Sequence, residues 1–231
     1  MKICVVTCTG KRPRMMPLCS KWLRRQRRQP DAWVISLGEG EDLGDFELPP
    51  YATVHRWNPE TIGRGLTGQI DTNSKYQIEV MRHVPKDHAA VYFDDDDWYG
   101  PNYLSAVAGD LELGIAFTGN GSERRYCVAT NRWMHVEKSG CNAGAVGMHN
   151  AAIPDWIAWM QDPSTKWSWF SQRGWQVNLR NEATRVSIKN APGLGHLFPP
   201  VQAKWRADLP PWAKLREWIG GDVDDYIELM R

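Results

Sequence analysis

No stretch of this sequence approaches the run of about 18 apolar residues that a membrane-spanning helix needs. The amino terminus, Met1 to Val6, has the pattern of a short strand rather than the longer apolar core of a secretory signal, so we expect a soluble protein. Cysteine is scarce: there are five, an odd number, with no C-x-x-C pair. Cys4 and Cys8 fall on one face of the first expected strand, which fits buried thiols in a reducing cytoplasm.

A strong excess of one charge is missing too. With 28 Lys and Arg against 27 Asp and Glu, the net charge of +1 does not by itself indicate a nucleic-acid binder. The sequence also contains no internal repeat and no low-complexity tract. Its 231 residues are enough for one domain with a large core, or for one domain with a small appendage.

Short apolar segments alternate along the chain with segments of helical periodicity. We expect strands at 3–7, 33–37, 52–55, 89–93, 114–118 and 186–188, with one or two more between 125 and 136. We expect helices at 17–28, 73–84, 102–111, 153–160 and 165–173, and two short ones at the end, the last capped by Asp222. Such alternation implies right-handed crossovers, so the predicted fold class is α/β: a Rossmann-like, mostly parallel central sheet flanked by helices.

Four consecutive aspartates, Asp94 to Asp97, follow the expected strand at 89–93 and precede an aromatic pair, Trp98 and Tyr99. A buried strand therefore delivers carboxylates to its carboxyl end, where open α/β sheets bind ligands. Adjacent carboxylates repel one another, and a divalent cation with oxygen ligands, Mg2+ or Mn2+, would neutralise them. The alternative is a solvated acidic turn. The buried strand before the aspartates and the aromatic pair after them favour the metal site.

The order of these elements resembles the nucleotide-sugar-dependent glycosyltransferases of the A-type fold, in particular glycosyltransferase family 2. The corresponding segments are Val5 to Thr7, Leu18 to Gln29, Trp33 to Leu37 and Phe93 to Asp97. The resemblance covers roughly residues 1 to 195, and the chain also looks similar to small phage-encoded members of the group. It implies an A-type domain over 1–200, with a nucleotide-binding half at 1–100 and an acceptor half at 101–200, followed by a helical extension at 201–231.

A cation that bridges both phosphates of a leaving nucleotide diphosphate stabilises the developing charge. Two carboxylates in a D-x-D spacing can hold it, and two registers are available, Asp94 with Asp96 or Asp95 with Asp97. The resemblance places Asp94 and Asp95 beside the nucleotide and Asp96 on Mn2+ or Mg2+, with Asp97 nearby. It also implies His196 as a further ligand, although a histidine in a loop is more often a polar surface residue.

The resemblance implies a UDP-sugar as the donor, beside the loop after the first strand. Thr7 and Thr9 would offer hydroxyl and backbone groups to the nucleotide, and Arg12 would stack on or pair with the uracil or phosphate. Arg12 fits a solvated surface charge equally well. In relatives the second strand often ends with two aspartates and a glycine, and one of these carboxylates contacts the base of the nucleotide. Here only Glu39 is available for that role.

An inverting transferase needs a carboxylate that takes the proton of the acceptor hydroxyl. By resemblance this base precedes a glycine that ends a helix, and counting back from Gly174 reaches Asp162. Asp162 fits the N-cap of a helix before Thr165 equally well. Asp155 and Glu182 are reserve candidates. If none of them serves, a retaining mechanism becomes possible.

Basic residues are concentrated near the amino terminus, where eight occur without any acid: Lys11, Arg12, Arg14, Lys21, Arg24, Arg25, Arg27 and Arg28. On one helix, Arg24, Arg25, Arg27 and Arg28 cannot all face the core, so we expect a basic surface able to contact phosphates of an acceptor. The alternatives are a solvated helix balanced by acids elsewhere, or a face that touches anionic lipid.

Five of the 13 tryptophans fall between residues 156 and 175. Trp156 and Trp159 have helical spacing and are expected in the core. Trp167 and Trp169 lie two positions apart and cannot share one helix face, so one of them is expected at the acceptor cleft, with Trp98 as a further aromatic contact.

These observations predict a metal-dependent glycosyltransferase of the host cytoplasm. The predicted acceptor is a hydroxymethylated pyrimidine in phage DNA, and the competing acceptors are lipid-linked or cell-envelope glycans. Another enzyme class, metal-dependent nucleotidyl or phosphoryl transferases, would use the same carboxylates. A non-catalytic alternative is a basic DNA-binding module whose acidic loop is stabilised by calcium.

Overall fold

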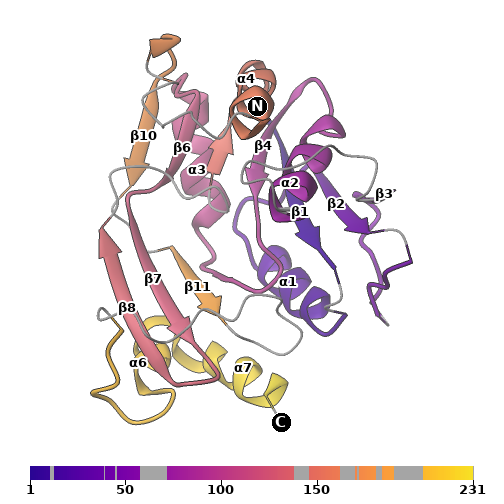
Figure 1. Cartoon of the computed structure of the whole chain (residues 1–231). Helices are drawn as coiled ribbons and strands as arrows, with labels where there is room; N and C mark the ends of the chain where they lie inside the picture. The colour runs from indigo at the N-terminus through magenta and orange to yellow at the C-terminus, as the bar shows by residue number, and fades with distance from the viewer. Residues whose placement is uncertain are drawn as a thin grey trace.

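The computed structural model describes residues 1–10, 13–38, 40–44, 46–57, 72–137, 146–161, 170, 172–180, 184–189 and 205–230. Within these residues a seven-stranded sheet has the order β10-β6-β9-β4-β1-β2-β3 (Figure 1). Its strands are β1 (Lys2–Thr9), β2 (Ala32–Gly38), β3 (Ala52–Trp57), β4 (His88–Tyr92), β6 (Phe117–Asn120), β9 (Val146–Met148) and β10 (Val177–Arg180).

The central sheet is mostly parallel, as predicted. β1 pairs in parallel with β2 and β4, β2 with β3, and β10 with β6, whereas β9 runs antiparallel between β4 and β6. Successive side chains of β1 point to opposite faces of the sheet and pack into two different hydrophobic cores. Ile3 and Val5 lie in one core, and Cys4 and Val6 lie in the other. Because both faces of β1 and β4 are covered, these strands are continuous apolar runs in the sequence.

Helices cover both faces of this sheet. They are α1 (Met15–Arg24), α2 (Thr72–Arg82), α3 (Tyr103–Glu112), α4 (Ile153–Gln161), α6 (Ala213–Ile219) and α7 (Val223–Leu229). Apolar residues of α1, α3, α6 and α7 share one core, and those of α2 and α4 share the other. Trp156 lies fully buried in the second core, and Trp159 packs against it, as their spacing predicted. None of the described helices is long and apolar enough to cross a membrane.

A second sheet, which the sequence did not predict, lies beside the first. Its order is β5-β11-β7-β8, with β5 (Trp98–Tyr99), β7 (Ser122–Cys127), β8 (Arg132–Glu137) and β11 (Arg185–Lys189). β11 is antiparallel to β5 and parallel to β7. Because β5 directly follows the four aspartates, this pairing brings β11 to the end of β4.

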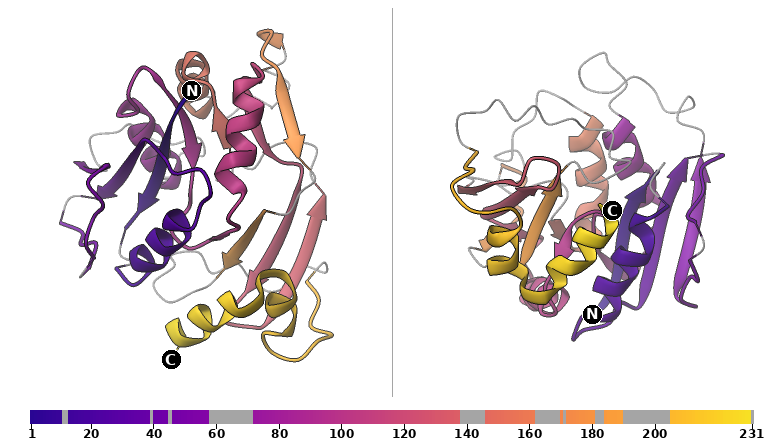
Figure 2. Two further views of the ribbon diagram at one scale, coloured as in Figure 1. Left: turned by 180° about the vertical axis from the view of Figure 1, so that it is seen from behind. Right: turned by 90° about the horizontal axis from the view of Figure 1, so that it is seen from below.

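The C-terminal helices are part of the same core as α1. Figure 2 shows them lying alongside α1, and Val223, Tyr226 and Leu229 are buried there. The expected domain boundary near residue 200 lies outside the described residues. Asp222 occupies the N-cap position of α7, as predicted, but its side chain makes no capping hydrogen bond. Its carboxylate instead accepts hydrogen bonds from the side chains of Arg25 and Trp98.

Helix α1 ends at Arg24, four residues before the expected end. The amide of the buried Gln26 explains this, because its Nε2 donates to the carbonyl oxygens of Trp22, 3.1 Å away, and Gly100, 3.0 Å away. Its Oε1 accepts from the amide of Leu104 at 3.0 Å, in the first turn of α3. One side chain thus satisfies backbone groups at the end of one helix and the start of another. The helix expected at 165–173 lies largely outside the described residues.

Candidate metal centre beside strand β4

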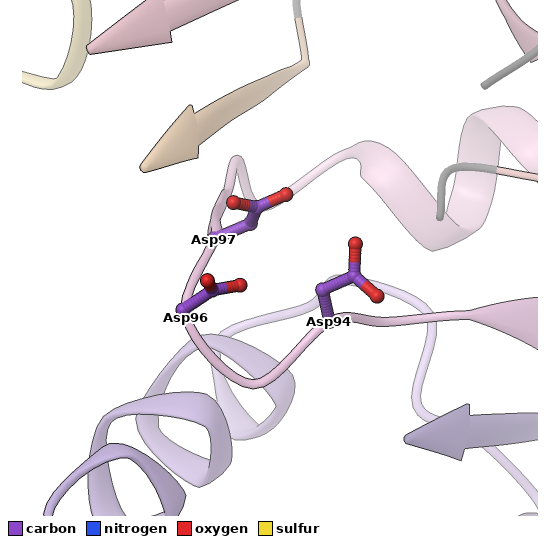
Figure 3. A group of neighbouring side chains, drawn as sticks. All are labelled: Asp94, Asp96 and Asp97. Carbon is purple, nitrogen blue, oxygen red and sulfur yellow. The ribbon is translucent and has the colours of Figure 1, made fainter. Parts of the chain in front are cut away.

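The aspartate loop, Asp94 to Asp97, leaves the carboxyl end of β4 after Phe93, whose amide donates to Val6 of β1 at 3.0 Å. Asp94, Asp96 and Asp97 each offer a carboxylate oxygen, and these oxygens lie within 4.8 Å of one another. Figure 3 shows the three side chains gathered on the same loop and turned toward one another. Asp97 is fully buried, Asp96 is 8% exposed and Asp94 is partly buried. The structure therefore brings together three of the four aspartates that the sequence singled out.

Two of the four aspartates hold the loop to its neighbours. The buried Asp95 accepts a hydrogen bond from Thr9 Oγ1 at 2.6 Å, which ties the loop to the end of β1. Asp97 Oδ1 accepts from the amide of Ile188 at 2.8 Å, which ties it to β11. The loop is thus fixed to both sheets, so its position does not depend on local turn geometry alone.

A buried arginine completes the cluster. Arg185 Nη2, on β11, lies 2.8 Å from Asp94 Oδ2 and also donates to Asp97 Oδ2. Its Nη1 lies 3.8 Å from the buried Glu123, and its guanidinium lies 5.8 Å from the ring centre of Tyr99. No sequence pattern pointed to Arg185 as a site residue. Its only signal is a cation at the start of a short apolar strand, and nothing local connects that strand to residues 94–97.

Burial and like charges disfavour ionisation of these acids. Burial raises the pKa of Asp94 to about 7; Asp97 and Asp96 add to the rise, and Arg185 opposes it. Burial also raises the pKa of Asp97, against the effect of Arg185 and Lys189. A bound cation would favour the ionised forms. An oxygen-only donor set with this excess of negative charge fits Mg2+ or Mn2+.

The two threonines expected beside the nucleotide lie at the predicted strand end, with their hydroxyls turned into the protein. Thr7 Oγ1 donates to the carbonyl oxygen of Phe93 at 2.8 Å and accepts from Trp33 Nε1 at 2.9 Å. Thr9 donates to Asp95, as described above. Both are buried, and they link β1 to the aspartate loop.

Several predicted residues lie outside the part of the chain that the structure describes. These are Arg12, Glu39, Asp162, Trp167, Trp169, Glu182 and His196. The reserve base Asp155 is described, and both of its oxygens are engaged: Oδ1 lies 2.9 Å from Arg173 Nη1, and Oδ2 accepts from Trp175 Nε1 at 2.6 Å.

One of the three predicted acceptor-binding arginines, Arg25, meets an acid of the C-terminal helices. Arg25 Nη1 lies 2.6 Å from Asp222 Oδ1, while Trp98 Nε1 donates to Asp222 Oδ2 at 2.9 Å. Lys21, on the same surface, lies 2.6 Å from Asp225. The structure thus corresponds in part to the alternative of a basic helix balanced by acids elsewhere.

The remaining two arginines of that prediction differ in their surroundings. Arg28 Nη2 donates to the carbonyl oxygen of Met1 at 2.5 Å, whereas Arg24 is exposed at the end of α1.

Tyr226 of α7, another residue that the sequence did not reveal, reaches the aspartate loop. Its hydroxyl lies 3.5 Å from the carbonyl oxygen of Asp96 and accepts from Trp22 Nε1 at 3.2 Å.

No protein-family model and no curated protein matches the sequence. Solved structures do match the fold. A mannosyltransferase from Pyrobaculum calidifontis, in complex with GDP-Man and Mn2+, has a TM-score of 0.54 at 10% identity, covering 84% of this chain and 58% of that one. S. aureus TarS 1-349 in complex with UDP-GlcNAc gives 0.46 at 12% identity, covering 82% and 59%. The galactosyltransferase LgtC, with donor and acceptor sugar analogs, gives 0.44 at 11% identity, covering 98% and 95%.

The present chain thus spans less than two thirds of the mannosyltransferase structure. At 10% identity, that likeness shows a shared fold, which confirms the predicted fold class.

Proposed function

We propose that this chain, which has the A-type glycosyltransferase fold, is a metal-dependent glycosyltransferase that moves a sugar from a nucleotide-sugar donor to an acceptor hydroxyl. The observation that carries this proposal is the cluster of Asp94, Asp96 and Asp97 at the carboxyl end of β4. In open α/β sheets this end of the strands is where ligands bind. The similar mannosyltransferase, moreover, was solved with GDP-Man and Mn2+.

In this proposal Asp94 and Asp96 hold the cation, Mn2+ or Mg2+. Asp95 and Asp97 fit less well as the metal-binding pair. Asp95 accepts a hydrogen bond from Thr9, and both carboxylate oxygens of Asp97 already accept hydrogen bonds. When bound, the cation stabilises negative charge on the leaving nucleotide diphosphate. The protein's own contribution is a loop held in place beforehand, so that little reorganisation is needed when charge develops.

The proposed donor is a UDP-sugar, with the nucleotide beside the end of β1. Arg12 and Glu39 remain the proposed contacts to the phosphate and the base. Glu41 is a second acid available at the end of β2: its Oε2 accepts from the amide of Gly38 at 3.2 Å. It also lies against Gly10, where a Cβ would collide with its carboxylate. Gly10 therefore lets the loop after β1 approach this acid closely.

For an inverting reaction the proposed base is Asp162, which would take the proton of the acceptor hydroxyl. Asp155 fits this role poorly, because Arg173 and Trp175 occupy its two oxygens. His196 remains a proposed third metal ligand, from the segment that follows β11.

The proposed acceptor is a hydroxymethylated pyrimidine in DNA, with lipid-linked or envelope glycans as the alternative. Arg14, Arg24 and Arg27 support a phosphate-binding surface, because all three are exposed on or beside α1. The pairing of Lys21 and Arg25 with acids of α7 and its N-cap weakens that surface. Trp98, Trp167 and Trp169 remain the proposed aromatic contacts of the acceptor.

Release of UDP or GDP from a panel of nucleotide sugars, with Mn2+ or with EDTA, tests the proposed activity. We expect release with Mn2+ and its loss in Asp96→Asn. The matched control is Asp87→Asn, which removes a surface carboxylate that pairs with Lys2 at 2.7 Å. Equal release in both variants would contradict the proposal. Pyrophosphate release from nucleoside triphosphates would instead indicate a nucleotidyl transferase, and stabilisation by DNA alone, unchanged in Asp96→Asn, a binding module.

A further inference from the structure

Arg185 is a cation buried against the candidate metal centre, with only 2% of its side chain exposed. In the antiparallel pairing of β11 with β5 it lies opposite Tyr99, so the second sheet fixes its distance from the aspartate loop. Tyr99 is itself buried and stacks on Phe93, with ring centres 3.6 Å apart. The guanidinium therefore occupies a packed position, and its place does not depend on a flexible side chain at the surface.

A buried guanidinium is costly unless its charge is compensated, and the same holds for a buried carboxylate. The charges of Arg185 and Asp97 compensate each other, and Asp94 forms an ion pair with the same guanidinium. The remaining oxygen of Asp97 accepts from the backbone of Ile188. Arg185 thus compensates two carboxylates of the cluster, Asp94 and Asp97.

We propose that Arg185 is the internal counter-cation of the aspartate loop: it compensates Asp94 and Asp97 when no divalent cation is bound, and its charge opposes the binding of a cation that shares Asp94. The inference rests on the proposed metal-dependent transfer and names a positioning residue for it. Arg185 acts through the carboxylates and needs no contact with the donor or the acceptor.

Two cations that share Asp94 repel each other, and the repulsion is strong where water is excluded. Binding of Mn2+ and the charge of Arg185 are therefore coupled. Removing the guanidinium leaves Asp94 and Asp97 with less positive charge beside them, so a bound ion stabilises them more. We expect Arg185→Gln to lower the melting temperature in EDTA and to tighten Mn2+ binding by about tenfold. A residue that only packed the second sheet would lower the melting temperature without this gain in affinity.

The experiment measures two quantities for the full chain: the Kd for Mn2+ by calorimetry, and the rise in melting temperature between EDTA and saturating Mn2+. The variants are Arg185→Gln, Arg185→Lys and the control Arg216→Gln. Arg216 Nη2 lies 2.7 Å from Asp224 in an exposed ion pair of the C-terminal helices that does not include a residue of the aspartate loop. We expect a larger Mn2+-induced rise and a lower Kd in Arg185→Gln than in wild type, with wild-type values in the control.

Folding of Arg185→Gln only in the presence of Mn2+ would be the strongest form of the same coupling and would support the inference. If this variant does not fold in either condition, Arg185→Lys decides: the shorter side chain places its ammonium farther from Asp94 and Asp97, so these carboxylates are less well compensated and the Mn2+-induced rise should exceed that of wild type. A rise equal to or smaller than that of wild type overturns the inference alone. If wild type itself does not respond to Mn2+, the proposed function is overturned together with the inference.

Discussion

Substitution of Tyr226 tests whether the C-terminal helices are an integral part of the core. The ring is fully buried, stacks on Trp22 with ring centres 6.3 Å apart, and carries a hydroxyl within reach of the aspartate loop. Truncating a buried aromatic side chain costs about 3–5 kcal/mol in the free energy of unfolding. For a chain of this size, that loss lowers the melting temperature by about 6–20 °C. Tyr226→Phe keeps the ring and loses only hydrogen bonds, so we expect a smaller cost of about 0.5–1.5 kcal/mol.

The assay is urea unfolding of both variants, followed by fluorescence and by circular dichroism, with Glu228→Ala as the control. Glu228 is exposed on the same helix, so its substitution should change the free energy of unfolding by no more than about 0.5 kcal/mol. A loss below about 1 kcal/mol for Tyr226→Ala would mean that α7 does not pack against α1 as described. It would also support the sequence-based view of residues 201–231 as a separate extension.

Three further predictions address the site, the thiols and the basic surface. Asp97→Asn should lower the free energy of unfolding by about 3–5 kcal/mol, because it leaves the buried Arg185 without one carboxylate; urea unfolding that matches Asp87→Asn would contradict this. Burial raises the pKa of Cys4 to about 12, so this thiol should resist labelling at pH 8 until the protein unfolds; rapid native labelling, read by peptide mass spectrometry, would refute the burial. Neutralising Arg24, Arg25, Arg27 and Arg28 together should weaken DNA binding and flatten its salt dependence; unchanged binding would remove α1 from any DNA-facing surface.

The sequence predicted the parts of the site that local patterns encode. The apolar run 89–93 indicated a buried strand. Because the aspartates follow this run directly, they were predicted at the carboxyl end of a strand in a parallel sheet. Arg185 escaped prediction because its contact with Asp97 joins residues 88 positions apart through a strand pairing with no local signature. The end of α1 was misplaced for a related reason, because Gln26 ends that helix through a bond to Gly100.

Two of the basic residues near the amino terminus are compensated by acids from the other end of the chain, and local sequence could not predict this pairing. Arg25 pairs with Asp222 and Lys21 with Asp225, about 200 positions later. Asp222 lies at the N-cap of the last helix, as predicted, but Arg25 and Trp98 occupy its carboxylate, so its side chain makes no capping hydrogen bond. Local sequence identifies the charges, and only the tertiary fold pairs them.

The most direct test of the central claim is anomalous diffraction from a crystal soaked with Mn2+ and UDP. We predict an anomalous peak bonded to carboxylate oxygens of Asp94 and Asp96, with the diphosphate of UDP on its open side. A peak elsewhere, or no ion at the loop while UDP is bound, would contradict the claim.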